Sequence, residues 1–169
     1  MLSELLLVIN MQNDFINGKM EVPEAHKILP KIIKKLDTTK KDIIFVMDTH
    51  DVNYLNTQEG KLYPTEHCLK SSEGWHIIPE LQPFIPKVKY LVEKTTFGCA
   101  ALISLAQEYD TLELLGVTSE VDVITNALLL KTFFPEKSIY VDKRCCAGTT
   151  KSLHNAAMKV MNECQVQVI

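Results

Sequence analysis

The residues best suited to bind a metal ion follow an apolar run at residues 42–46 (DIIFV). Asp48 and His50 are two positions apart, so their side chains share one face of an extended chain. His67 could fold back across the polar loop that follows, and Glu59 in that loop is a further ligand, directly or through water. Two imidazoles and a carboxylate suit Zn²⁺, Mn²⁺ or Fe²⁺ and leave positions open for water and substrate. The alternative is that these are solvated loop residues.

Two further positions could take part in catalysis. Lys94 ends the run at residues 90–93 (YLVE), where it could lie at the edge of a sheet beside a carboxylate or simply be solvated. Residues 116–122 (GVTSEVD) follow another apolar run and open a helical pattern. Backbone N–H groups at such a helix start stabilise anions, so a nucleophile placed there would meet an oxyanion hole. An ordinary helix cap with an acidic first turn is the simpler interpretation, and both can hold.

The elements that must position these residues alternate along the chain. The predicted strands are 5–9, 42–46, 90–93, 111–115, 138–141 and 165–169, and the predicted helices are 25–36, 100–109, 119–134 and 152–164. The strands are apolar without alternation, which is typical of parallel strands covered on both faces. We therefore expect an α/β fold with about six parallel strands between helices, and ligands at the carboxyl ends of the strands. Residues 49–75 form a long polar loop, which in a compact domain is usually functional or disordered.

Composition narrows the class of protein. A chain of 169 residues with 46% hydrophobic and 23% charged residues predicts one globular domain, 1–169. The net charge of −3 and a single arginine, Arg144, argue against nucleic-acid partners and against bidentate arginine recognition of phosphate or carboxylate. Apolar runs are too short to cross a membrane, and the opening residues lack a secretory pattern. With five irregularly spaced cysteines, we expect a cytoplasmic protein with reduced thiols.

The segment at residues 8–15 (VINMQNDF) resembles the opening of the isochorismatase-like cysteine hydrolases, which include nicotinamidases, other small-amide hydrolases and isochorismatases. The resemblance covers essentially the whole chain and implies a three-layer, Rossmann-like sandwich with a six-stranded parallel sheet. It places Asp48, His50 and His67 on the family's metal site and Lys94 on its catalytic lysine. Residues 116–122 fall on the nucleophile turn, where the backbone N–H groups of Thr118 and Asp122 would face an oxyanion. A cis peptide at 117–118 is also implied.

Two positions depart from the family pattern. Asn10 stands where the family has an aspartate base, and Asp122 stands where it has the nucleophilic cysteine. An amide cannot accept a proton at neutral pH, and a carboxylate is not a thiol. The hypothesis is that the thioester mechanism of the family is not open to this degenerate set of Asn10, Lys94 and Asp122. Cys99 and Cys145 do not align with the nucleophile.

Three functions follow. The first is a hydrolase of altered mechanism for a small amide, carboxylic or heterocyclic metabolite, with Asp122 as acid or nucleophile, or with a metal-activated water. The second is a family member that binds such a ligand, with or without metal, and has no turnover. The third, a structural or partner-binding protein, has no positive support in the sequence. Phe15, Trp75 and Phe97 are the candidates for an apolar wall against a planar ligand. The resemblance also implies a homo-oligomer, and neither nucleic acid nor membrane is expected as a partner.

Overall fold

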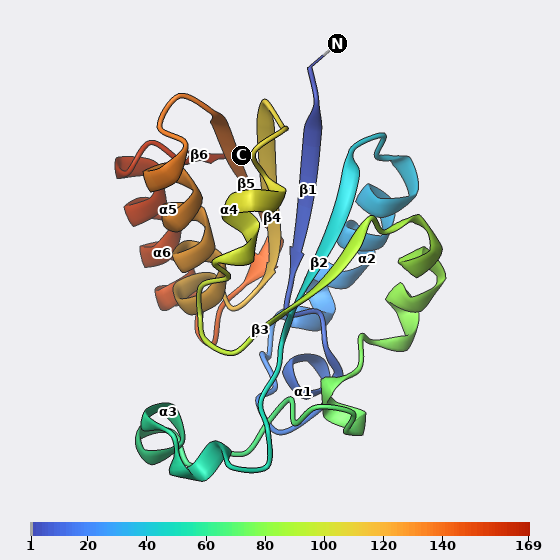
Figure 1. The fold of residues 1–169 in the computed structure, drawn as a ribbon, viewed down its shortest axis with the longest axis vertical. Helices are drawn as coiled ribbons and strands as arrows, with labels where there is room; N and C mark the ends of the chain where they lie inside the picture. Colours follow the sequence, from blue (N-terminus) through green and yellow to red (C-terminus); the bar gives the residue numbers. More distant parts are fainter. Residues whose placement is uncertain (1) are drawn as a thin grey trace.

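The fold is a six-stranded parallel sheet between two layers of helices (Figure 1). A computed structural model describes residues 2–169. The strand order is β3-β2-β1-β4-β5-β6. The strands are β1 (Glu4–Ile9), β2 (Asp42–Asp48), β3 (Tyr90–Lys94), β4 (Thr111–Val117), β5 (Ser138–Ala147) and β6 (Gln167–Val168). The predicted strands and their parallel arrangement are confirmed, and the continuous apolar run of β1 lies wholly in the core.

The helices cover both faces of this sheet. They are α1 (Asn13–Ile16), α2 (Ala25–Thr38), α3 (Gln58–Leu62), α4 (Ala101–Leu105), α5 (Ile124–Phe133) and α6 (Lys151–Glu163), with 3₁₀ segments η1 (Tyr54–Asn56), η2 (Glu73–Trp75) and η3 (Pro79–Lys87). Right-handed crossovers place α2 on one face and α4, α5 and α6 on the other (Figure 1). Within residues 2–169, none of these helices combines the length and the apolarity that crossing a membrane requires.

Three segments differ from their sequence predictions. The helix expected at 100–109 ends at Leu105, and the Lys137 ammonium donates to the carbonyls of Ala106 and Gln107 just beyond this end, each at 2.7 Å. The helix expected at 119–134 opens with a π-helical turn, η4 (Ser119–Val123), before α5 begins. The loop at 49–75 contains η1, α3 and η2, and α3 extends beyond the carboxyl edge of the sheet (Figure 1).

The order of the strands fixes where a site can form. The chain leaves β1 toward β2 and β3 on one side and returns to β4, β5 and β6 on the other. Connections therefore diverge between the carboxyl ends of β1 and β4, which is the switch point where ligands bind in open α/β sheets. The polar residues that follow or end these strands are Asn10, Asp48, Lys94 and Thr118, and all four are buried.

Candidate active site

A chain of buried charges crosses the carboxyl edge of the sheet, with Lys94 at its centre. The Lys94 ammonium lies 3.0 Å from Asp48 Oδ1 and 2.9 Å from Asp122 Oδ1. Burial alone would lower the pKa of Lys94, but the negative charges of Asp122 and Asp48 outweigh it and raise that pKa above its ordinary value. Lys94 is therefore a fixed cation that joins the carboxylate at the end of β2 to a carboxylate in the turn after β4.

The second oxygen of Asp48 meets both predicted imidazoles. Asp48 Oδ2 lies 3.2 Å from His50 Nε2 and 3.3 Å from His67 Nε2. One ligand atom from each of these three residues can be chosen so that all lie within 4.8 Å of one another. Glu59 Oε1 is 3.9 Å from His50 Nε2, which places the fourth predicted ligand beside the other three.

The chemistry of this set fits a divalent cation. Bonds of about 2.0–2.2 Å from each ligand to one ion require ligand atoms no more than about 4.4 Å apart. This limit is close to the 4.8 Å within which the three ligand atoms lie. The carbonyl of Thr65 lies 2.8 Å from His67 Nδ1 and can only accept, so Nε2 is the nitrogen left to face the cluster. Burial would raise the pKa of Asp48, but hydrogen bonds from His50 and His67 and the charge of Lys94 hold it well below its ordinary value. Asp48 is thus held as an anion, as a ligand must be.

Two residues that the sequence analysis missed hold the metal ligands in place. Gln12 Oε1 accepts from the Asp48 N–H at 2.7 Å, and its Nε2 donates to the Asp48 carbonyl at 2.8 Å. Asp14 Oδ2 accepts from the N–H of Cys68 at 2.7 Å, which fixes the segment that carries His67. Both residues lie in the segment after β1, next to the switch point, and that position is the signal that could have identified them.

The turn after β4 carries Asp122. Its Oδ2 accepts from Thr118 through the backbone N–H at 3.3 Å and the hydroxyl at 3.2 Å. The peptide between Val117 and Thr118 is cis, as the family resemblance implied. The expected oxyanion donor at Thr118 therefore faces the carboxylate of Asp122, so in this structure that donor is engaged inside the protein rather than directed to a ligand.

Asn126, also missed from the sequence, ties this turn to the loop after β3. Its amide donates to the Asp122 carbonyl at 2.8 Å and to the Phe97 carbonyl at 3.0 Å, and its Oδ1 accepts from the Cys99 N–H at 2.8 Å. A buried side chain that satisfies three backbone groups fixes their spacing. Asn126 thereby sets the distance between the turn with Asp122 and the wall with Phe97.

Asn10 lies at the end of β1 with a backbone φ of 51° and no exposed surface. Neither its Oδ1 nor its Nδ2 has a hydrogen-bond partner among the described residues. A buried amide in this state costs free energy relative to a paired one. Its side-chain amide has no basic oxygen at neutral pH.

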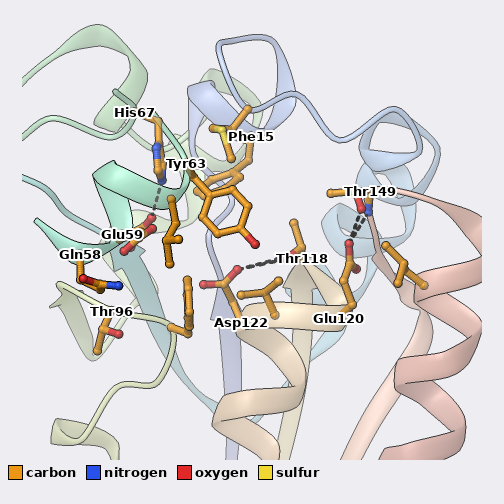
Figure 2. Close-up of a pocket in the computed structure, with 16 residues that line it drawn as sticks. Phe15, Gln58, Glu59, Tyr63, His67, Thr96, Thr118, Glu120, Asp122 and Thr149 are labelled. Carbon is orange, nitrogen blue, oxygen red and sulfur yellow. Dashed lines mark hydrogen bonds and ion pairs between the residues drawn. The ribbon is translucent and has the colours of Figure 1, made fainter. Parts of the chain in front are cut away.

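A cavity of about 890 Å³ opens above these charges (Figure 2). Figure 2 shows Glu59 and His67 at one side of it, Asp122 and Thr118 at the floor, and Glu120 and Thr149 at the other side. Among the sixteen residues drawn there, the apolar ones are Phe15, Met20, Leu62, Phe97, Val121 and Leu153.

The structure places only two of the three expected wall residues in this cavity. Phe15 and Phe97 line it, whereas Trp75 does not. The indole N–H of Trp75 donates to Thr49 Oγ1 at 2.8 Å, and the ring lines a separate hollow of about 340 Å³ beside Leu91. The expectation that Trp75 forms part of this wall is therefore not met: its one polar side-chain atom is bonded to Thr49, at the opposite end of the segment 49–75.

No cysteine of the described chain lines the cavity. Cys99 and Cys145 are buried, and burial raises the pKa of both thiols, that of Cys145 to about 11. Thiolate is the nucleophilic form, and it is scarce at neutral pH for such groups. No cysteine replaces the missing nucleophile.

Comparisons with solved structures show where this fold recurs. A pyrazinamidase of Pyrococcus horikoshii in complex with zinc superposes with a TM-score of 0.83 at 22% identity, covering 99% of this chain and 98% of the other. The nicotinamidase/pyrazinamidase PncA from Bacillus subtilis gives 0.85 at 22% identity, covering 98% of both chains. PnC1 from L. infantum in complex with nicotinate gives 0.85 at 15% identity, covering 99% and 92%. At these identities the likeness shows a shared fold.

A search of curated proteins gave no match. The sequence profile of the isochorismatase domain, in contrast, matches residues 4–169. That match spans all six strands and every residue of the buried charge chain. The chain therefore belongs to the isochorismatase family.

Proposed function

We propose that this protein is a hydrolase of small organic amides in which water attacks the substrate directly and no thioester forms. The observation that carries the proposal is the placement of Asp122. Its carboxylate lies at the floor of the cavity, 2.9 Å from the Lys94 ammonium and beside the Asp48 cluster. The amidases that share this fold support the amide class of substrate.

Asp48, His50 and His67 would hold a divalent cation, Zn²⁺, Mn²⁺ or Fe²⁺, with Glu59 as a further ligand directly or through water. The zinc complex of the P. horikoshii relative supports this assignment. Such an ion supplies Lewis acidity and lowers the pKa of water in its coordination shell.

The residues of this chain would transfer the protons and position the groups that do so. Asp122 accepts a hydrogen bond from the attacking water, takes one proton as the C–O bond forms, and returns it to the departing nitrogen as the C–N bond breaks. Lys94 holds Asp122 in position, because its ammonium contacts one carboxylate oxygen. Thr118 holds the other oxygen. The products are a carboxylic acid and ammonia or an amine, so atoms and protons balance.

The test is the variant Asp122→Asn, assayed for product with metal-loaded protein and a panel of small amides that includes nicotinamide. The change removes the proton acceptor and keeps the shape, so turnover should fall by about 10²–10⁴-fold while thermal stabilisation by the amide persists. Asp37→Asn, on the exposed end of α2, is the matched control and should retain activity. Undiminished turnover in Asp122→Asn would exclude this role.

A second candidate is ligand binding without turnover. The observation that favours it is the engagement of the Thr118 N–H by Asp122, which removes an oxyanion donor from the substrate. It predicts stabilisation by the amides with no product from the unaltered protein. Amide hydrolysis gained by the double variant Asn10→Asp with Asp122→Cys would then show that the rest of the scaffold is competent.

A further inference from the structure

The mouth of the cavity is ringed by large apolar side chains that water reaches. Leu62 ends α3 and Tyr63 follows it, Phe97 lies in the loop after β3, and Leu153 lies in the first turn of α6. Their exposed fractions are 65%, 62%, 40% and 46%. Single exposed apolar residues are ordinary, but four from three separate segments around one opening mark a binding surface.

The cavity is also larger than a one-ring amide needs. Its volume of about 890 Å³ lies near the upper end of the range of about 300–1,000 Å³ that is typical of sites for drug-sized ligands. Phe15 and Met20 continue the apolar surface from the rim inward, toward the polar floor at Asp122. A ligand that fills this space has a polar end and an extended apolar body.

The charged residues that line the cavity determine which charge the polar end of a bound ligand can carry. Asp48, Glu59, Glu120 and Asp122 contribute carboxylates to the lining, and no lysine or arginine of the described chain lines it. Lys94 is committed to Asp48 and Asp122. A divalent ion would offset the charge at the side with Glu59, whereas Glu120 lies at the other side (Figure 2). A negatively charged ligand would face these carboxylates without a basic partner from the chain.

We infer that the substrate is an uncharged amide with an apolar body larger than a single aromatic ring. This inference rests on the proposed function, because it places the amide at Asp122. The apolar body lies across Phe15 and Phe97 and reaches the rim at Leu62 and Leu153.

The test is calorimetric binding of butanamide, hexanamide and octanamide to the zinc-loaded protein, with octanoate as the charged counterpart. A buried methylene contributes about 0.8 kcal/mol, so affinity should rise by about tenfold for every two methylenes. Octanoate should bind at least about tenfold more weakly than octanamide, because its charge meets Glu120 and Asp122. No binding, a rise below about twofold per step, or stronger binding of octanoate would each overturn the inference.

Variants at the rim locate the apolar body. Octanamide should bind to Leu62→Ser and to Leu153→Ser only about threefold more tightly than hexanamide, or less. Each substitution removes an apolar side chain that the end of the longer amide would contact. Leu55→Ser is the matched control, since Leu55 is 46% exposed near Leu62 in sequence but does not line the cavity. Leu55→Ser should leave the increase in affinity from hexanamide to octanamide unchanged.

The same variants distinguish a rim that binds a ligand from a rim that contacts a second copy of this chain. If Leu62→Ser changes the oligomeric state by light scattering and leaves the chain-length dependence intact, the rim is an interface between copies and the inference fails. Product formation is scored separately from binding. A chain-length dependence without product would refute the proposed hydrolysis alone, whereas product from butanamide without that dependence would refute this inference alone.

Discussion

Gln12 holds the peptide groups on both sides of Asp48. Its Oε1 accepts from the Asp48 N–H at 2.7 Å and its Nε2 donates to the Asp48 carbonyl at 2.8 Å, so one side chain fixes the end of β2. Nε2 also donates to the Trp75 carbonyl at 2.8 Å. The orientation of the Asp48 carboxylate therefore depends on an amide that would not itself contact a metal.

We expect Gln12→Met to weaken metal binding without removing a ligand. The methionine fills similar volume but leaves the Asp48 peptide groups unpaired, and losses of outer-shell partners typically cost about 10–100-fold in metal affinity. Competition with a fluorescent zinc chelator measures the affinity. Gln82→Met, at an exposed position on η3, should leave it unchanged.

The imidazole of His50 should be required for metal binding. His50→Ala removes one of three ligands, and we expect stoichiometric metal in the unaltered protein and little in the variant, by elemental analysis after dialysis. Chelation should lower the melting temperature of the unaltered protein but not that of the variant. Metal retained at full stoichiometry in His50→Ala would exclude His50 as a ligand. His26→Ala, on the exposed side of α2, is the control and should retain the metal.

Loss of Lys94 should destabilise the fold. Lys94→Met leaves Asp48 and Asp122 buried without their shared cation, and breaking one partner of a buried charge pair typically costs about 3–5 kcal/mol. Urea unfolding measures the loss. Lys94→Met combined with Asp122→Leu should recover part of it, because one uncompensated carboxylate is removed; a double variant as unstable as the sum of both single variants would show that the two residues do not interact.

The pH dependence of stability should reveal a second buried charge cluster, beneath α2. Burial would raise the pKa of Asp142, but hydrogen bonds from Arg144 and Lys35 hold it well below its ordinary value. The unfolded chain therefore binds a proton at higher pH than the folded one, so this contribution is complete above the unfolded pKa of about 3.9 and is lost as pH falls.

Asp142→Asn should consequently lower the free energy of unfolding at pH 7, and the gap to the unaltered protein should narrow as pH falls below about 4. Urea titrations at pH 7, 5 and 3.5 measure it. A gap that stays constant over this range would show that the Asp142 charge does not stabilise the fold.

The sequence predicts the fold well because the central strands β1 and β2 carry continuous apolar runs that are buried, a pattern typical of parallel strands covered on both faces. It also predicts which residues end the strands, and Asp48 and Lys94, at the ends of β2 and β3, meet for that reason. Gln12 and Asn126 carry no such pattern, because their partners are backbone groups distant in sequence. Trp75 shows the same limit, since its hydrogen-bond partner Thr49 is 26 residues away in sequence.

The buried ammonium of Lys94 also constrains the order in which this site could change by mutation. It already pairs with both Asp48 and Asp122, and the fully buried side chain of Asn10 has no hydrogen-bond partner among residues 2–169. A carboxylate introduced first at Asn10 would be a third buried negative charge at the carboxyl edge of the sheet, with no partner at its position, and would be strongly disfavoured. Replacing Asp122 first would remove one of the two carboxylates paired with Lys94, so that the new charge at residue 10 would not increase the number of buried carboxylates. The order of the two substitutions therefore matters. The path that changes Asp122 before Asn10 is open, whereas the path that changes Asn10 first passes through an unstable protein.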